Sequence, residues 1–206
     1  MAWALLRRRA RSAFSFKCFI HTVMAGSIAF AASSAPSLAA STATQAANAE
    51  VLNQLPFEDR ADFEDARRGL LLRPESVQIT DDEGRLVWDL DSFLAFIPGE
   101  DDAPATVNPS LWRNAQLNLE YGLYEVVPGI YQVRGYDLAN FTFVRGETGW
   151  IALDAGSTPA TARAALDLLT QHFGEIPVSA LIYSHPHVDH YGGGACRCCG
   201  CGERHG

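Results

Sequence analysis

The chain has 206 residues, of which 48% are hydrophobic and 19% charged, a composition typical of a globular protein rather than a disordered or fibrous one. This length suits one domain with a hydrophobic core. The formal net charge is −8. Residues 50–206 hold 11 basic and 24 acidic residues, a net charge of −13. An acidic domain repels phosphate backbones, so we predict no nucleic-acid partner, and any anion-binding site must depend on local cations.

Residues 1–49 are predicted to be a secretory signal peptide and leader. An arginine-rich start precedes a mostly apolar stretch over residues 19–32, and small residues then offer cleavage patterns at 37–39 and 47–49. This order is typical of an exported protein, by the general or the twin-arginine route. The apolar stretch is short for a membrane span and contains polar residues. We therefore expect a secreted or periplasmic protein with no stable span after signal removal, and a flexible leader over residues 40–49.

Residues 50–128 are predicted to form an N-terminal segment ahead of the main domain. The charged run at 57–71 favours a short surface helix that ends near Gly69. Residues 81–84 are typical of a turn, and residues 86–90 of a strand that follows it.

A second helix is expected in this segment from Asn108, which can cap it, and Pro109, which suits the first helical position. Gly122 is expected to end this helix. Its apolar face would consist of Leu111, Trp112, Ala115 and Leu119.

Residues 129–194 are predicted to be the first part of an α/β domain. Short β-branched or aromatic runs predict three strands, at residues 130–133, 141–144 and 150–153. Thr158 and Pro159 are typical of a helix start, and Gly174 of its end. The apolar run at 178–183 does not alternate with polar residues, which favours a strand buried on both faces. Strands, a helix and a buried strand in this order describe one layer of an α/β sandwich.

The residues with the clearest chemistry follow that last strand directly, in the run Ser-His-Pro-His-Val-Asp-His. Three imidazoles and a carboxylate provide the mixture of nitrogen and oxygen ligands that zinc prefers. On an extended segment His185 and His187 point the same way and can share one ion. Asp189 and His190 come after the chain turns and can reach a second ion. Residues 192–194, all glycine, would let the backbone pass close to the ions and begin the next helix.

The spacing His-x-His-x-Asp-His in this run resembles the signature of the metallo-β-lactamase superfamily. The resemblance implies an αββα sandwich, present here in its N-terminal part, with a site for two Zn²⁺ ions. His185 and His187 would bind one ion, and Asp189 and His190 the other. Asp154 matches the superfamily's acidic residue at the preceding strand end and would orient the ligands without binding the metal. A turn-forming aspartate beside a glycine is the alternative interpretation of Asp154.

Four blocks upstream of this motif look like the N-terminal half of the alkyl sulfatases of the same superfamily. They are residues 62–69, 87–91, 106–113 and 129–138. This resemblance implies a zinc-dependent hydrolase of linear primary alkyl sulfates, dodecyl sulfate among them, that is a homodimer when full length. It places the remaining metal ligands and the sulfate-binding residues beyond residue 206, and it assigns no catalytic residue within the chain. Other hydrolases of the superfamily, such as thioesterases, lactonases and β-lactamases, share the histidine motif but are not expected to share these blocks.

Residues 195–206 depart from this pattern and hold four of the five cysteines. With His205 these cysteines can be interpreted as a second zinc site, which would favour a non-enzymatic zinc-binding fragment. Their spacing, however, differs from the paired Cys-x-x-Cys of zinc ribbons. We favour a reading-frame slip as the explanation of the tail, because with GC-rich codons assumed a one-base shift can give an apolar segment of the kind the fold needs. The chain as written is therefore predicted to be inactive or unstable, with an exposed sheet edge.

Overall fold

The computed structural model describes residues 40–97, 99 and 102–195, and all its helices and strands belong to one unit that begins at Ala39. The predicted signal peptide up to residue 39 and the cysteine-rich tail from Cys196 lie outside the described residues. Within the described ranges, no helix is both long enough and apolar enough to cross a membrane.

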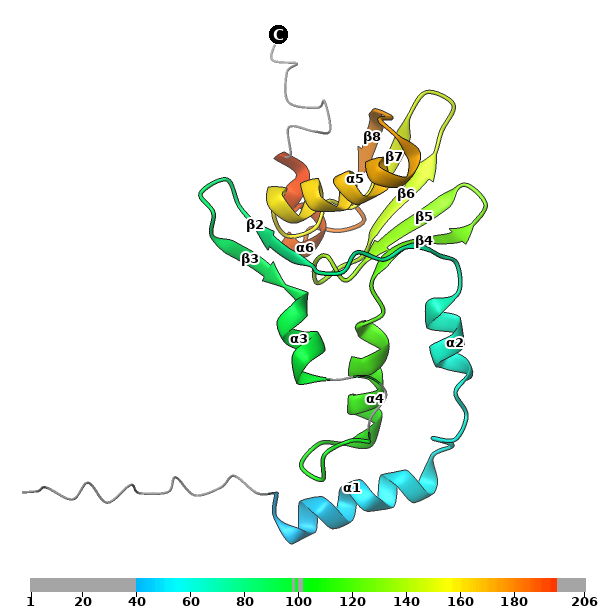
Figure 1. Ribbon diagram of the computed structural model, residues 1–206, viewed down its shortest axis with the longest axis vertical. Coiled ribbons are helices and arrows are strands. Elements are labelled where there is room, and N and C mark those ends of the chain that lie inside the picture. The colour runs from blue at the N-terminus through cyan, green and yellow to red at the C-terminus, as the bar shows by residue number, and fades with distance from the viewer. Residues whose placement is uncertain (1–39, 98, 100–101, 196–206) are drawn as a thin grey trace, which may run out of the picture. The chain divides into compact units, whose positions relative to one another are not determined.

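The larger sheet has six strands in the order β1-β4-β5-β6-β7-β8 (Figure 1). Its strands are β1 (Leu70–Leu72), β4 (Gly122–Val127), β5 (Ile130–Arg134), β6 (Phe141–Arg145), β7 (Trp150–Leu153) and β8 (Val178–Ile182). Neighbouring strands are antiparallel from β1 to β7, whereas β7 and β8 run parallel. A parallel pair needs a crossover connection, and helix α5 (Pro159–Phe173) provides it.

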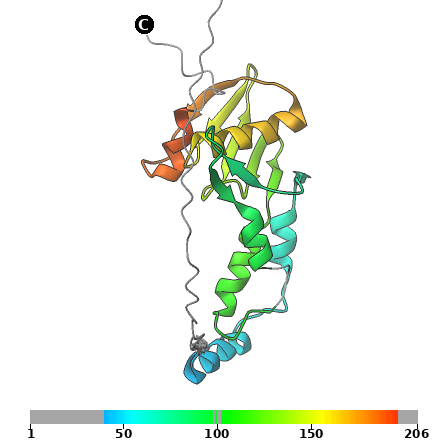
Figure 2. The same cartoon turned by 60° about the vertical axis from the view of Figure 1, so that its left-hand side comes forward.

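Helix α5 begins as predicted, with Thr158 as its cap and Pro159 in its first turn. Its apolar face packs on the sheet, where Ala165 and Leu169 are buried together with Val133 of β5. Figure 2 shows the helix lying along one face of the sheet. The three predicted strands, this helix and the α/β fold class are confirmed.

The flexible leader expected over residues 40–49 is wrong, because most of it belongs to helix α1 (Thr42–Gln54). The Ser41 hydroxyl caps this helix by accepting a hydrogen bond from the Thr44 N–H at 3.1 Å, and alanine has the highest helix propensity. No residue of α1 is buried, so the helix carries no apolar stripe that a sequence pattern could reveal. The candidate cleavage pattern at 47–49 lies inside the helix.

The N-terminal segment contains a predicted strand and several elements that were not predicted. Apart from α1 and the strands that it contributes to the larger sheet, its elements are α2 (Ala61–Arg67), a two-stranded antiparallel sheet of β2 (Gln78–Thr80) and β3 (Leu86–Asp89), α3 (Leu90–Phe96) and α4 (Pro109–Asn118). Strand β3 matches the prediction. Strand β2 has three residues and α3 has seven, lengths at which sequence periodicity carries little signal.

Two glycines connect this segment to the larger sheet. Gly69 has φ 79° and turns the chain from α2 into β1, so the helix is shorter than predicted and Leu70 begins a strand. Gly122 begins β4 instead of ending α4, which corrects the prediction. A Cβ atom at Gly122 would lie 2.4 Å from the Leu72 carbonyl oxygen on β1, so a side chain there would prevent the two strands from pairing.

Helix α4 starts at the predicted cap, where Asn108 Oδ1 accepts from the Ser110 N–H at 2.9 Å. The predicted apolar face is partly wrong. Leu111 is 65% exposed, whereas Trp112 and Gln116, which lie four residues apart on one helical face, are both buried.

Arg113 on α4 fixes this helix to the start of α2. Its Nε and Nη2 donate to the two carboxylate oxygens of Asp62 at 2.7 and 2.6 Å, and its Nη1 donates to the Phe57 carbonyl oxygen at 2.9 Å. The hydrogen bond from Arg113 is the largest cause that lowers the pKa of Asp62, although burial opposes the shift.

We expect this pair to make stability depend on acidity. A carboxyl group whose pKa is lowered in the folded state contributes stability above its unfolded pKa of about 4, and this contribution is lost as the pH falls through the folded pKa. Urea unfolding should therefore show Asp62→Asn to be less stable than wild type at pH 7, with a smaller difference at pH 3. Asp65→Asn is the control, because the Asp65–Arg68 pair is exposed and should contribute little. A difference between Asp62→Asn and wild type that is the same at both pH values would contradict the assignment.

Strand β8 corrects the last prediction about the sheet. A strand buried on both faces was expected, but β8 pairs with β7 alone in the described part of the chain and lies at the sheet edge. Ile182 at its end is 51% exposed, and Tyr183 after it is 48% exposed. An apolar edge strand of this kind is prone to aggregation.

Candidate metal centre

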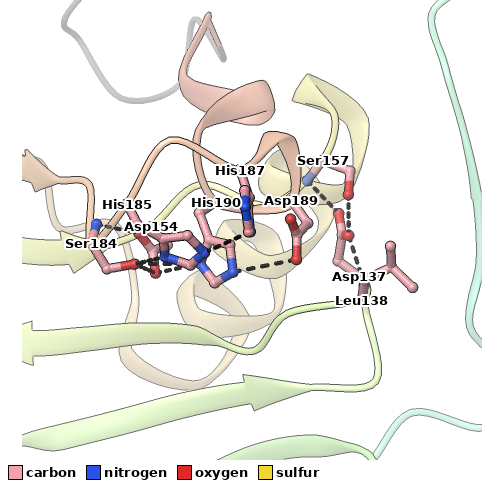
Figure 3. A network of polar contacts seen from close by, with 9 residues as sticks. All are labelled: Asp137, Leu138, Asp154, Ser157, Ser184, His185, His187, Asp189 and His190. Carbon is pink, nitrogen blue, oxygen red and sulfur yellow. Dashed lines mark hydrogen bonds and ion pairs between the residues drawn. The ribbon is translucent and has the colours of Figure 1, made fainter.

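The predicted ligands lie on one loop beyond the carboxyl end of β8. Residues 184–187 leave the strand, α6 (Val188–Tyr191) follows, and the 3-10 helix η1 (Gly192–Ala195) ends the described chain. We call residues 184–194 the histidine loop. Because β7 and β8 are parallel and adjacent, the end of β7 at Asp154 lies beside the start of this loop. Figure 3 shows these side chains gathered into one polar network.

His185 contacts the other two imidazoles of the histidine loop. His185 Nε2 lies 3.2 Å from His187 Nδ1, and the ring centroids of His185 and His190 are 3.9 Å apart. His190 Nε2 lies 3.3 Å from Asp189 Oδ2. The structure thus brings all four predicted ligands together, with His185 and His187 exposed to solvent.

This donor set fits zinc in its chemistry, since borderline divalent ions prefer imidazole nitrogen with carboxylate oxygen. The side chains hydrogen-bond to one another, and among residues 40–97, 99 and 102–195 no group of three or more His, Cys, Asp or Glu side chains is arranged to hold a metal ion. Binding an ion between His185 and His187 would therefore require the rings to exchange their mutual hydrogen bond for the metal.

Asp154 holds the two ends of the ligand run. Its carboxylate accepts from the Ser184 N–H and hydroxyl, each at 2.7 Å, and its Oδ2 lies 2.8 Å from His190 Nδ1. Burial opposes ionisation of Asp154, but these hydrogen bonds outweigh it and lower the pKa. Asp154 is the non-glycine residue with positive φ in the described chain, at 63°, a conformation that aspartate tolerates better than most residues.

The contact with Asp154 also affects the pKa of His190 and determines which ring nitrogen carries a proton. The hydrogen bond to Asp154 is the largest cause that raises the pKa of His190, and desolvation works against it. With Nδ1 donating to the carboxylate, Nε2 is the nitrogen left to face Asp189 and to bind an ion. This is the geometry that metal-binding histidines commonly show.

Gly192 and Gly193 of the histidine loop closely approach backbone atoms of the connection between β7 and α5. Their predicted approach to the ions stays a prediction. The Gly193 N–H donates to the Gly156 carbonyl oxygen at 3.0 Å, and the Ala155 N–H donates to the His190 carbonyl oxygen at 2.7 Å. A Cβ atom at Gly192 would lie 2.2 Å from the Ser157 carbonyl oxygen. The glycines begin η1, as predicted, whereas α6 begins before them, so Asp189 and His190 are themselves helical.

Two polar residues of this network were not assigned a role from sequence. Ser184 connects Asp154 to His185, since its hydroxyl also lies 2.9 Å from His185 Nδ1. Asp137, between β5 and β6, is 6% exposed and hydrogen-bonds to Ser157 and Thr161. Its partners lie 20 and 24 residues away in the chain, so no local pattern indicates them.

Comparison with known proteins identifies the family. Residues 134–195 match the model of the metallo-beta-lactamase superfamily. The chain is 49% identical over 180 residues to an (R)-specific secondary-alkylsulfatase of Pseudomonas sp., which covers 86% of this chain and 27% of the relative. It is 46% identical over 154 residues to a linear primary-alkylsulfatase of Pseudomonas sp., covering 75% and 23%. The chain belongs to the alkyl sulfatases of the metallo-β-lactamase superfamily.

A solved structure agrees with this family. The stereoselective inverting sec-alkylsulfatase from Pseudomonas sp. superposes with a TM-score of 0.69 at 53% sequence identity, over 75% of this chain and 24% of that one. The chain spans about a quarter of the length of the alkyl sulfatases it matches, and it corresponds to their N-terminal portion. The metallo-β-lactamase fold and the family predicted from the sequence blocks are confirmed.

Proposed function

We propose that this chain carries the first part of the two-zinc centre of an alkyl sulfatase that hydrolyses sulfate esters of linear primary alcohols. The observation that carries the proposal is the cluster of three imidazoles and a carboxylate, held by Asp154, at the carboxyl ends of β7 and β8 in a chain of this family. His185 and His187 would hold one ion, and Asp189 and His190 the other.

The residues of the chain prepare this site in two ways. Asp154 fixes the ring orientation of His190, so its Nε2 faces the cluster. His185 and His187 are exposed, so a substrate can reach them from solvent. Zinc, when bound, supplies Lewis acidity toward a sulfate oxygen and a water that ionises near pH 7. Local positive charge matters here because the rest of the chain is acidic and repels a sulfate ester at long range.

That the substrate is a primary alkyl sulfate is also a proposal. The relatives named above include enzymes named for primary and for secondary alkyl sulfates. Export to the periplasm or the medium, and a homodimer of the full-length protein, are proposed with it. The other hydrolases of the superfamily remain the alternative, and substrate screening separates them.

The test uses the full 206-residue chain, its zinc content and its hydrolysis of dodecyl sulfate and of a secondary alkyl sulfate of equal length. We expect zinc to bind weakly and turnover to be absent or very slow, because further ligands are predicted to lie beyond residue 206. Two tightly bound zinc ions with turnover would contradict the predicted inactivity. A folded chain that binds no zinc at all would contradict the metal centre.

A further inference from the structure

Asp137 is a buried carboxylate that the proposed chemistry does not use. It lies between β5 and β6, is 6% exposed, and accepts hydrogen bonds on both oxygens (Figure 3). Oδ1 accepts from the Leu138 N–H at 2.7 Å and the Ser157 hydroxyl at 2.6 Å. Oδ2 accepts from the Ser157 N–H at 2.8 Å and the Thr161 hydroxyl at 2.5 Å. Asp137 therefore joins the turn between β5 and β6 to the connection that leads from β7 into α5.

That connection, residues 154–158, is the surface on which the histidine loop rests. We call it the support loop. Asp154 accepts from Ser184 at one end of the ligand run. The Ala155 N–H donates to the His190 carbonyl oxygen, and the Gly156 carbonyl oxygen accepts from the other end of the histidine loop. The support loop thus contacts the histidine loop before, within and after the ligand residues.

The packing around Gly156 shows how closely Asp137 and the support loop fit. Gly156 has φ 69°, and a Cβ atom there would lie 2.8 Å from Asp137 Oδ2 and 2.4 Å from the Phe141 ring. A displaced Asp137 carboxylate would therefore leave the support loop without the partner that fixes its position at Ser157.

We propose that Asp137 is a positioning residue for the metal centre, acting through the support loop to fix the orientation of His190 and the backbone of the histidine loop. The inference rests on the proposed function for its metal, but the positioning itself is a property of the metal-free chain. Asp137 contacts none of the four predicted ligands by any hydrogen bond of the described chain.

An amide in place of the carboxylate would lose at least one of these hydrogen bonds, because all four partners of Asp137 donate. An asparagine presents one oxygen and one NH₂ group. The hydroxyls of Ser157 and Thr161 can turn to accept from the NH₂ group, but a backbone N–H cannot. Whichever way the amide is turned, either the Leu138 N–H or the Ser157 N–H loses its acceptor and faces a donor.

The experiment compares Asp137→Asn with a matched control, Asp91→Asn, in the full chain. Asp91 also accepts from a backbone N–H and a serine hydroxyl, those of Val77 at 2.9 Å and Ser76 at 2.5 Å, and its partners belong to the β2–α3 region. Hydrogen–deuterium exchange without metal measures positioning, and zinc titration against a chromophoric chelator measures the consequence for the site.

We expect Asp137→Asn to speed exchange in residues 154–158 and 184–194 by about tenfold or more. We also expect it to weaken zinc binding by about 10- to 100-fold. Asp91→Asn should change neither. Ser157→Ala removes a hydroxyl and keeps the backbone hydrogen bond, so it should speed exchange and weaken zinc binding by a smaller factor. This variant replaces Asp137→Asn in the experiment if Asp137→Asn does not fold.

Unchanged exchange of the histidine loop in Asp137→Asn and Ser157→Ala would overturn the inference, as would an equal effect of the Asp91 variant. A wild-type chain that binds no zinc would refute the proposed metal centre alone, and the exchange measurement would still decide whether Asp137 positions the loop.

Discussion

Replacing His187 with alanine should weaken zinc binding by more than about 100-fold, beyond the usual range for the loss of a residue that only orients a ligand. His187 Nδ1 lies 3.2 Å from His185 Nε2, so the two rings are placed to share an ion. Without His187, only His185 remains of the pair proposed to hold that ion. The measurement is competition with a chromophoric chelator, followed by metal analysis of the desalted protein.

The matched control for this prediction is His172→Ala. His172 lies in the last turn of α5, is exposed and contacts the ring of Phe173, so its loss removes an imidazole without touching the histidine loop. We expect wild-type affinity for this variant. If His172→Ala lowers the affinity as much as His187→Ala does, zinc is binding to scattered surface histidines and the assignment of the ion site is wrong.

The parts of the fold that could be predicted are those whose signals are local. Thr158 and Pro159 predict the start of α5 because the cap residue and the first-turn proline are adjacent in the sequence at the beginning of the helix. Strands β5 to β7 are short apolar runs separated by turn residues. The histidine run was visible for the same reason, since the four predicted ligands lie within six residues.

The features that were not predicted correctly depend on contacts with residues that are distant in the chain. Gly122 has the same appearance as a helix terminator, and only its approach to the Leu72 carbonyl oxygen shows that it begins β4. Asp137 has an ordinary sequence context, and its role comes from Ser157 and Thr161. Strand β8 was expected to be buried because its sequence is apolar, but burial also requires neighbouring elements that the described residues do not place around it.

The glycines after the ligand run were predicted to let the backbone pass close to the ions, and this stays a prediction. Gly192 and Gly193 pack against the support loop, so backbone contacts as well as Asp154 position the histidine loop. A substitution there should therefore disturb the metal centre without removing a single ligand.

Gly193→Ala should lower the free energy of unfolding by about 1–3 kcal/mol, the usual cost of forcing atoms into a filled space. A Cβ atom at Gly193 would lie 2.0 Å from the Ala155 carbonyl oxygen and 2.7 Å from that of Thr158. Both are backbone atoms of the support loop, which cannot turn away as a side chain can. The loop must separate, which should break the hydrogen bonds at Ala155 and Gly193 and weaken zinc binding as well.

Gly194→Ala is the control for Gly193→Ala. It tests whether alanine anywhere in the glycine run lowers the free energy of unfolding. A Cβ atom at Gly194 would overlap even more closely, at 1.9 Å, but with the hydroxyl of Tyr183, the far end of a side chain that is 48% exposed and can rotate away. Urea unfolding should therefore show a much smaller loss for Gly194→Ala than for Gly193→Ala. Equal losses would mean that the approach of Gly193 to backbone atoms has no special cost, and the contact between η1 and the support loop would then not be what holds the histidine loop in place.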